Sequence, residues 1–342
     1  MEKIMIPPLD SNAAEVIKNN WAKMDKPLHS LGKLEEMVEK YAAMTGTALP
    51  DKIKSAMLLM CGDHGIAKYG VSAYPQEVTM QMINGYMRET AGANVMARHA
   101  GADVFVIDAG TAFDLSAMPK VQQEKVAWGT EDFTQGPAMT MEQAEKALKV
   151  GMKAADECID KGYNLLVTAE MGIGNTTSTA AIVSAFLGLP PELTVGRGTG
   201  INDERMAIKR KVVADGLAKN QPRLGDAMDI LCKVGGYDHA GLAGMILAGA
   251  RRRVPTMVDG VNATAAALLA YGLEPACADY MLCSHLSAEI SHAKMLEVLQ
   301  LTPIVDAGMR LGEGTGASLA IVILQMAINT YKELYKRGGM HA

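Results

Sequence analysis

The chain has 342 residues, of which 49% are hydrophobic and 21% charged, enough apolar material for one large α/β domain or two ordinary ones. The formal net charge is -5 and the basic residues are scattered, which argues against nucleic-acid binding and favours a small-molecule partner. The five cysteines form no C-x-x-C pair and are expected to be reduced core thiols.

The sequence gives no sign of a membrane segment. The N-terminus lacks a basic region followed by an apolar one, and no run of about 18 uninterrupted apolar residues occurs. We therefore expect a cytoplasmic protein that binds neither membrane nor nucleic acid.

The first 45 residues read as two helices, and an alternation of strands and helices follows. Continuous apolar strands between helices predict a mainly parallel sheet covered on both faces. Strands are expected at 55–65, 102–110, 164–174, 255–260, 280–285 and 302–308, and helices at 13–24, 31–44, 91–100, 240–253, 262–272 and 318–337.

These elements predict an α/β fold, doubly wound, with a Rossmann-like sheet of six strands. Residues 46–317 would form the large α/β catalytic domain, and residues 1–45 with 318–342 a small helical subdomain built from both termini. The segment 111–140 is the most loop-like and is expected to be a surface excursion.

Ligands of open parallel sheets bind at the carboxyl ends of the strands, where this chain is rich in glycine and polar residues. EMGIGNTTS (170–178) suits an anionic group at a helix start, although a tight capped turn explains it equally well. GRGTGIND (196–203) is followed by Lys209 and fits neither G-K-[ST] nor G-x-G-x-x-G. With SHLSAE (284–289), these loops predict a phosphate-bearing substrate.

Two acidic positions remain open to interpretation. Asp63 and His64 follow the first strand and should lie near the site, but no further ligand at a usual spacing supports a metal. Glu313, in MRLGEGTGAS (309–318), is either a catalytic carboxylate or a first-turn acid that interacts with a helix dipole, worth at most about 1 kcal/mol. The dipole does not require glycines on both flanks of Glu313.

The motifs together resemble those of the nicotinate-nucleotide:5,6-dimethylbenzimidazole phosphoribosyltransferase family. The resemblance implies transfer of ribose 5-phosphate from nicotinate mononucleotide to an aromatic base in cobamide biosynthesis, with release of nicotinate and without metal or organic cofactor. It runs from about residue 8 to residue 330 and rests on GDHGIAKYGVSAYPQEVT (62–79), AEMGIGNTTS (169–178), GRGTGIND (196–203), SHLSAEISH (284–292), RLGEGTGAS (310–318) and KPLHSLGKLEEM (26–37).

The resemblance also assigns roles to residues. Glu313 would take the proton from the attacking base, and Glu170 would stabilise positive charge on the ribosyl centre. The remaining residues would bind the phosphate and ribose: Gly172, Gly174, Asn175, Thr176, Gly198, Gly200, Lys209, Ser287 and Arg310.

The acceptor base is expected to bind between Tyr74, Met82, Met171 and Leu311. Methionine is abundant here, 25 in all, so ordinary packing is an alternative, but a flexible apolar pocket would suit phenol or p-cresol, which some relatives use. A phenol has a pKa of about 10 against about 4.3 for glutamate, which favours concerted proton transfer or a Glu313 pKa raised by burial.

Two further hypotheses concern the class of protein. The chain could be one subunit of a heterodimer with a homologous chain, since the family is expected to form dimers, and His29 and His239 stand where other residues are expected. A nicotinamide-dependent dehydrogenase is disfavoured because G-x-G-x-x-G and its acidic partner are missing.

Overall fold

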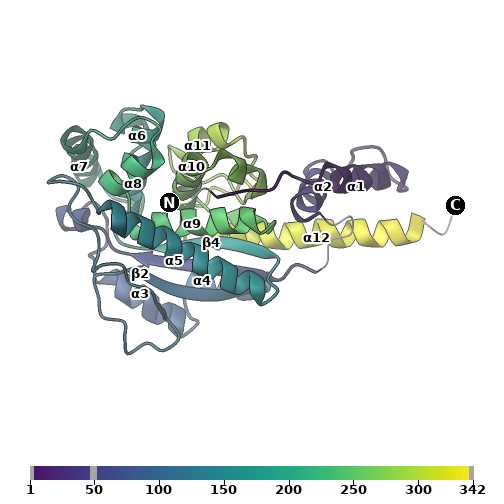
Figure 1. Cartoon of the computed structure of the whole chain (residues 1–342), viewed down its shortest axis with the longest axis horizontal. Coiled ribbons are helices and arrows are strands. Elements are labelled where there is room, and N and C mark those ends of the chain that lie inside the picture. Colours follow the sequence, from purple (N-terminus) through teal and green to yellow (C-terminus); the bar gives the residue numbers. More distant parts are fainter. Residues whose placement is uncertain (1–3, 47–51, 339–342) are drawn as a thin grey trace.

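A computed structural model describes residues 4–46 and 52–338 of the chain (Figure 1). The outermost residues of the predicted helical subdomain, 1–3 and 339–342, and residues 47–51 near its predicted boundary lie outside the described residues. None of the described helices is long and apolar enough to cross a membrane.

Six parallel strands form one sheet in the order β3-β2-β1-β4-β5-β6. β1 pairs with β2 on one side and with β4 on the other, so the strand order reverses between β1 and β4. Crevices at such a switch point are where ligands bind in this class of sheet. The strands are β1 (Ser55–Gly62), β2 (Ala102–Gly110), β3 (Gln122–Gln123), β4 (Leu165–Met171), β5 (Thr256–Val258) and β6 (Met281–Cys283).

The six-stranded parallel sheet was predicted correctly, but one strand was assigned to the wrong segment. Residues 302–308 form no strand and contribute only a bridge between Val305 and His285. The strand that completes the set of six is β3, which lies inside segment 111–140, expected to be a loop. Its two glutamines carry no apolar pattern, because this short edge strand is held by backbone pairing with β2 and by the Gln123 amide, which donates to the carbonyls of Leu115 and Val121.

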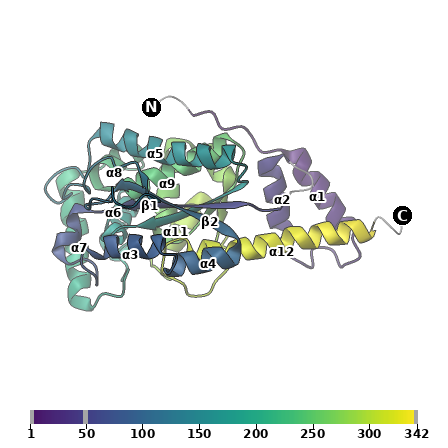
Figure 2. The same cartoon turned by 90° about the horizontal axis from the view of Figure 1, so that it is seen from below.

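Helices cover both faces of the sheet, with α5 and α9 on one face and α4 and α12 on the other (Figure 2). Small residues let α5 and α9 touch, since a Cβ on Gly151 would lie 1.7 Å from the carbonyl oxygen of Gly241. The helices that follow β1 are α3 (Val78–Met87), α4 (Gly92–Ala100), α5 (Met141–Asp160), α6 (Asn175–Leu187), α7 (Asp203–Asn220), α8 (Ala227–Val234), α9 (Tyr237–Arg251), α10 (Val261–Leu273), α11 (His292–Leu299) and α12 (Thr315–Gly338), with short 3-10 turns at Gly65–Tyr69, Pro191–Leu193 and Pro275–Tyr280.

The two N-terminal helices, α1 (Ser11–Lys23) and α2 (Lys33–Thr45), lie beside the distal part of α12 (Figure 1). The Trp21 ring meets Tyr331 edge-on at 4.9 Å between centroids, and Asn20 Nδ2 donates to the Tyr331 hydroxyl at 2.8 Å. Segments from both ends of the chain therefore pack together. The division into two domains at residues 45 and 318 stays a prediction.

Candidate active site

A cavity of about 700 Å³ opens at the carboxyl end of β4, beside the switch point of the sheet, and extends past the ends of β5 and β6. Most of the residues predicted for the site meet there, although they come from segments far apart in the sequence. The predicted residues that line the cavity are Tyr74, Met82, Glu170, Met171, Gly172, Asn175, Thr176, Gly198, Ser287, Arg310, Leu311 and Glu313.

Three predicted residues, Gly174, Gly200 and Lys209, do not line the cavity. Gly174 has a φ of +102° where α6 begins, and Gly200 has a φ of +94° in the loop before α7. Lys209 is 1% exposed, and its Nζ donates to Thr176 Oγ1 at 2.7 Å and to the Gly196 carbonyl at 3.2 Å. Burial lowers the pKa of Lys209 to about 8. Lys209 therefore connects the two glycine-rich loops, the one that carries Thr176 and the one that carries Gly196, through hydrogen bonds.

Glu313 lies in an unusual backbone segment. Gly312, Glu313 and Gly314 all have positive φ, at +85°, +58° and +74°. A Cβ on Gly312 would lie 2.6 Å from Glu170 Oε1, and one on Gly314 2.7 Å from Met57 Cε, so both flanking glycines are required. α12 begins only at Thr315, and its first turn contains no acid. Glu313 is therefore not the first-turn acid that the alternative interpretation required.

Glu170 is the last but one residue of β4 and is 5% exposed. Its Oε1 accepts the backbone N–H of Glu313 at 3.4 Å, and its Oε2 accepts from the Asn175 side-chain amide. Burial raises the pKa of Glu170 well above its usual value, and the negative charge of Asp238 adds to the rise. Two glutamates of raised carboxyl pKa therefore line the same cavity.

Burial raises the pKa of Glu313 as well, whereas the nearby Tyr86 side chain lowers it and Asp259 raises it further. A pKa raised by burial is one of the two alternatives that the sequence left open for Glu313. Asp259 was not singled out, although it lies at the end of the fourth predicted strand. Its carboxylate accepts from the backbone N–H groups of Gly314 at 3.1 Å and Ala317 at 2.9 Å, and so fixes the start of α12 beside Glu313.

The phosphate-binding candidates are connected by one half-buried acid, Glu289. Glu289 Oε1 accepts the Gly198 N–H at 2.9 Å, and Arg310 Nη1 donates to the Gly198 carbonyl at 3.2 Å. A Cβ on Gly196 would lie 1.8 Å from Glu289 Oε2, which explains that glycine. The loop carrying Ser287 is held by His292, whose Nδ1 accepts the Ser287 N–H at 2.9 Å.

The predicted base pocket has an open mouth and an apolar floor. Tyr74 is 54% exposed and Leu311 61%, whereas Met82 is half-buried and Met171 buried. The sequence analysis missed further lining residues, because Gly, Val and Asn after strands are common in any α/β protein. These residues are Val78, Ile173, Thr199, Gly260, Val261, Asn262, His285, Glu289 and Gly312.

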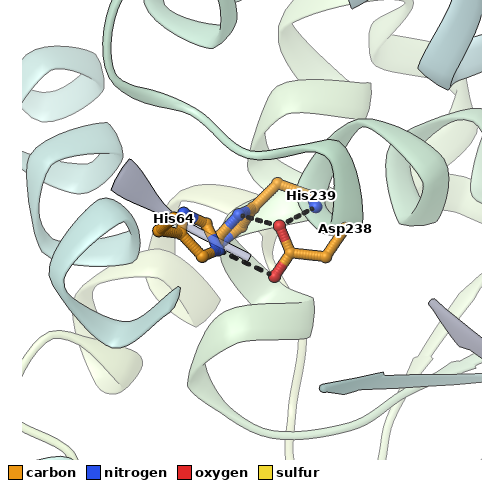
Figure 3. A group of neighbouring side chains, drawn as sticks. All are labelled: His64, Asp238 and His239. Atoms are coloured by element: carbon orange, nitrogen blue, oxygen red, sulfur yellow. Dashed lines mark hydrogen bonds and ion pairs between the residues drawn. The ribbon is translucent and has the colours of Figure 1, made fainter. Parts of the chain in front are cut away.

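Beneath the cavity, Asp238 lies between the rings of His64 and His239 (Figure 3). All three side chains are 1% exposed, and their ligand atoms lie within 4.8 Å of one another, close enough to share protons or a metal ion. His64 also contacts the phosphate loop, since a Cβ on Gly174 would lie 3.1 Å from His64 Cβ. The sequence placed His64 near the site but gave no role to Asp238.

The switch-point cavity, its glycine loops and its paired carboxyl groups define an α/β enzyme whose site suits a phosphate-bearing substrate. Comparison with known proteins agrees. A family model described as phosphoribosyltransferase matches residues 6–338.

The curated relatives include the nicotinate-nucleotide–dimethylbenzimidazole phosphoribosyltransferases of Chloroflexus aggregans, 46% identical over 329 residues, and Geobacter sulfurreducens, 46% identical over 324. These matches cover 96% and 94% of this chain and 93% and 92% of the relatives. The crystal structure of CobT from Thermus thermophilus superposes with a TM-score of 0.90 at 41% identity, covering 94% of this chain and 96% of that one. The chain belongs to the nicotinate-nucleotide–dimethylbenzimidazole phosphoribosyltransferase family, a family of enzymes.

Proposed function

We propose that this enzyme transfers ribose 5-phosphate from nicotinate mononucleotide to an aromatic lower-ligand base in cobamide biosynthesis and releases nicotinate. The observation that carries the proposal is the placement of Glu313 and Glu170 in one cavity with the two glycine loops. The names of the relatives support the same substrates.

In the proposed reaction, the base attacks the anomeric carbon of the β-nucleotide on the face opposite the departing nicotinate, and inversion gives an α-linked product. Glu313 accepts the proton of the base as the new bond forms. Its raised pKa makes it a stronger base than an ordinary glutamate, which brings it nearer to the pKa of the group it deprotonates.

For its role in stabilising positive charge, Glu170 must be ionised, which its raised pKa opposes and the hydrogen bonds donated by Asn175 and the Glu313 N–H favour. Positive charge develops on the ribosyl centre as nicotinate leaves, and a buried carboxylate stabilises it without moving. Gly172, Thr176 and Gly198 hold the phosphate with backbone and side-chain donors, and Lys209 supplies positive charge from behind them.

Two classes of acceptor base are candidates, a benzimidazole and a phenol. Tyr74, Met82 and Met171 line the cavity, and methionine side chains adapt to a small ring, which favours phenol or p-cresol as a second candidate. A phenol would give an O-glycosidic rather than an N-glycosidic product.

One incubation tests both proposals. Purified protein is mixed with nicotinate mononucleotide and equal amounts of dimethylbenzimidazole, adenine, phenol and p-cresol, and the products are identified by mass. Release of nicotinate with an α-ribotide of any of these bases supports the transfer reaction, and the dominant product identifies the base. No nicotinate release with any base, for the chain alone and with a homologous chain, would refute the proposed function.

The alternative assembly is a heterodimer in which this chain works only with a homologous partner. An equimolar homologous chain that co-purifies, together with an inactive isolated subunit, would support it. An active homodimer would exclude it.

A further inference from the structure

On the basis of the proposed function, we infer that Thr79 is a positioning residue for the transfer reaction. Its hydroxyl group connects α3, the helix beside the predicted base pocket, to the loop that is proposed to bind the phosphate. Thr79 does not itself line the cavity. Its partner Asp63 is a residue that the sequence placed near the site without giving it a role.

Asp63 is held firmly by its own backbone and by one of its carboxylate oxygens. It follows β1 directly and is fully buried. Its N–H donates to the Gly110 carbonyl at the end of β2 at 3.0 Å, and its carbonyl accepts the N–H of Thr130 at 3.0 Å. Oδ2 accepts the N–H of Ala112 at 2.9 Å. These hydrogen bonds fix the Asp63 carboxylate independently of Thr79.

The hydroxyl group of Thr79 forms two hydrogen bonds. Oγ1 donates to Asp63 Oδ1 at 2.6 Å and accepts the backbone N–H of Ile173 at 3.2 Å. A backbone N–H can only donate, so Thr79 accepts from Ile173 and keeps its own hydrogen for Asp63. Both donors therefore point from the loop towards Asp63, and hydrogen bonds arranged in this way strengthen one another.

The residues connected through Thr79 belong to two different parts of the site. Thr79 lies in the first turn of α3, and Val78 and Met82 of the same helix line the cavity where the acceptor base is predicted to bind. Ile173 also lines the cavity, and it lies in the loop 170–178 that is proposed to bind the phosphate. The Thr79 hydroxyl therefore sets the spacing between the base pocket and the phosphate loop.

The cavity end of α3 depends on this hydroxyl more than the far end does. At the far end, Asn94 Nδ2 donates to the Tyr86 carbonyl at 3.2 Å. At the cavity end, the residue that precedes the helix, Glu77, forms no side-chain cap. Thr79 is fully buried, so water cannot easily replace its hydrogen bonds when the hydroxyl is removed.

The spacing between α3 and the loop matters for the proposed reaction. The loop would hold the nucleotide by its phosphate, and α3 would hold the base that attacks the anomeric carbon. Reacting atoms must lie about 3–3.5 Å apart and in line, and a displacement of about 1 Å can lower the rate about 100-fold. Thr79 therefore controls the alignment of the two substrates more than the binding of either one.

Three variants test this role. Thr79→Val removes the hydroxyl at nearly constant volume, and Thr79→Ser retains it and should behave like the wild type. Thr256→Val is the matched control. Thr256 is also buried, its hydroxyl has no hydrogen-bond partner among the described residues, and it begins β5, at the end of the strand away from the cavity.

The first measurement compares two products of the reaction. Water competes with the base for the anomeric carbon: its oxygen forms a new C–O bond as the C–N bond to nicotinate breaks, which gives ribose 5-phosphate, nicotinate and a proton. With saturating substrates, we expect Thr79→Val to lower kcat about tenfold or more and the ratio of α-ribotide formed to nicotinate released about threefold or more. Thr79→Ser and Thr256→Val should keep the wild-type ratio.

The ratio distinguishes misalignment from loss of folded protein. Partial unfolding lowers both products in proportion, whereas a misplaced base lowers α-ribotide formation more than nicotinate release. A folded Thr79→Val enzyme with the wild-type ratio would overturn the inference.

The second measurement needs no activity, so it separates this inference from the proposed function. In ligand-free protein, the Ile173 amide hydrogen should exchange with solvent about tenfold or more faster in Thr79→Val than in the wild type, Thr79→Ser or Thr256→Val, with the amides of β1 as reference. An unchanged exchange rate would overturn the inference even if the transfer reaction were demonstrated. Faster exchange in a protein that releases no nicotinate would support the connection through Thr79 and refute only the proposed function.

Discussion

The backbone N–H of Glu313 lies 3.4 Å from Oε1 of Glu170, so the loop that carries one candidate catalytic carboxylate rests on the other. Gly312 makes this approach possible, because any Cβ there would collide with the Glu170 carboxylate. The position of the Glu313 loop therefore depends on the Glu170 carboxylate, and a change at either residue is expected to disturb the other.

Replacement of Glu313 by glutamine should lower kcat by a factor of about 100 or more and leave folding intact. Gln preserves the shape of the side chain but cannot accept a proton from the attacking base. The measurement is steady-state nicotinate release with the preferred base. Glu89→Gln is the matched control, because Glu89 is an exposed glutamate that also has a left-handed backbone, with a φ of +59°. A near-wild-type rate for Glu313→Gln would refute its role as the base.

Gly312→Ala should lower kcat more strongly than the backbone strain alone explains. Gly308 provides the comparison: its φ is +63°, but a Cβ there would meet nothing within 4 Å. Both alanines carry the left-handed penalty of roughly 1 kcal/mol, and only the one at Gly312 would push on Glu170. We expect a drop in kcat of about tenfold or more for Gly312→Ala and little change for Gly308→Ala. Equal activities would show that the contact with Glu170 is unimportant.

The strand pattern and the loop motifs made the sheet and most of the cavity predictable. Long apolar runs such as β1 are readily recognised, whereas β3 is a pair of polar glutamines held by pairing with β2 and by local hydrogen bonds of Gln123. Asp238 and Asn262 were invisible for another reason. They lie on helices far along the chain, and only the fold brings them under Glu170.

The phosphate site should weaken as the pH rises through about 8, because burial lowers the pKa of Lys209 to about 8 and the lysine then loses its charge. We expect the KM for nicotinate mononucleotide to climb above this pH. Lys209→Met should raise KM by about tenfold or more at neutral pH and remove that dependence. Lys211→Met, at an exposed lysine paired with Asp215, is the control. A Lys209→Met enzyme that keeps the wild-type pH dependence of KM would contradict this assignment.

Asp238→Asn should destabilise the protein by about 3–5 kcal/mol, the usual effect of removing one partner from a buried charged cluster. Burial alone would raise the pKa of Asp238, but His239 and His64 outweigh it and hold the pKa far below its usual range. The resulting stability is present above the unfolded pKa of about 4 and is lost only as the pH falls well below it. Urea denaturation at pH 7 measures the effect. Asp203→Asn is the control, since the Asp203 side chain is 91% exposed although it pairs with Arg197, and its loss should cost little stability. If the two variants lost equal stability, the buried cluster would contribute no more than a surface ion pair.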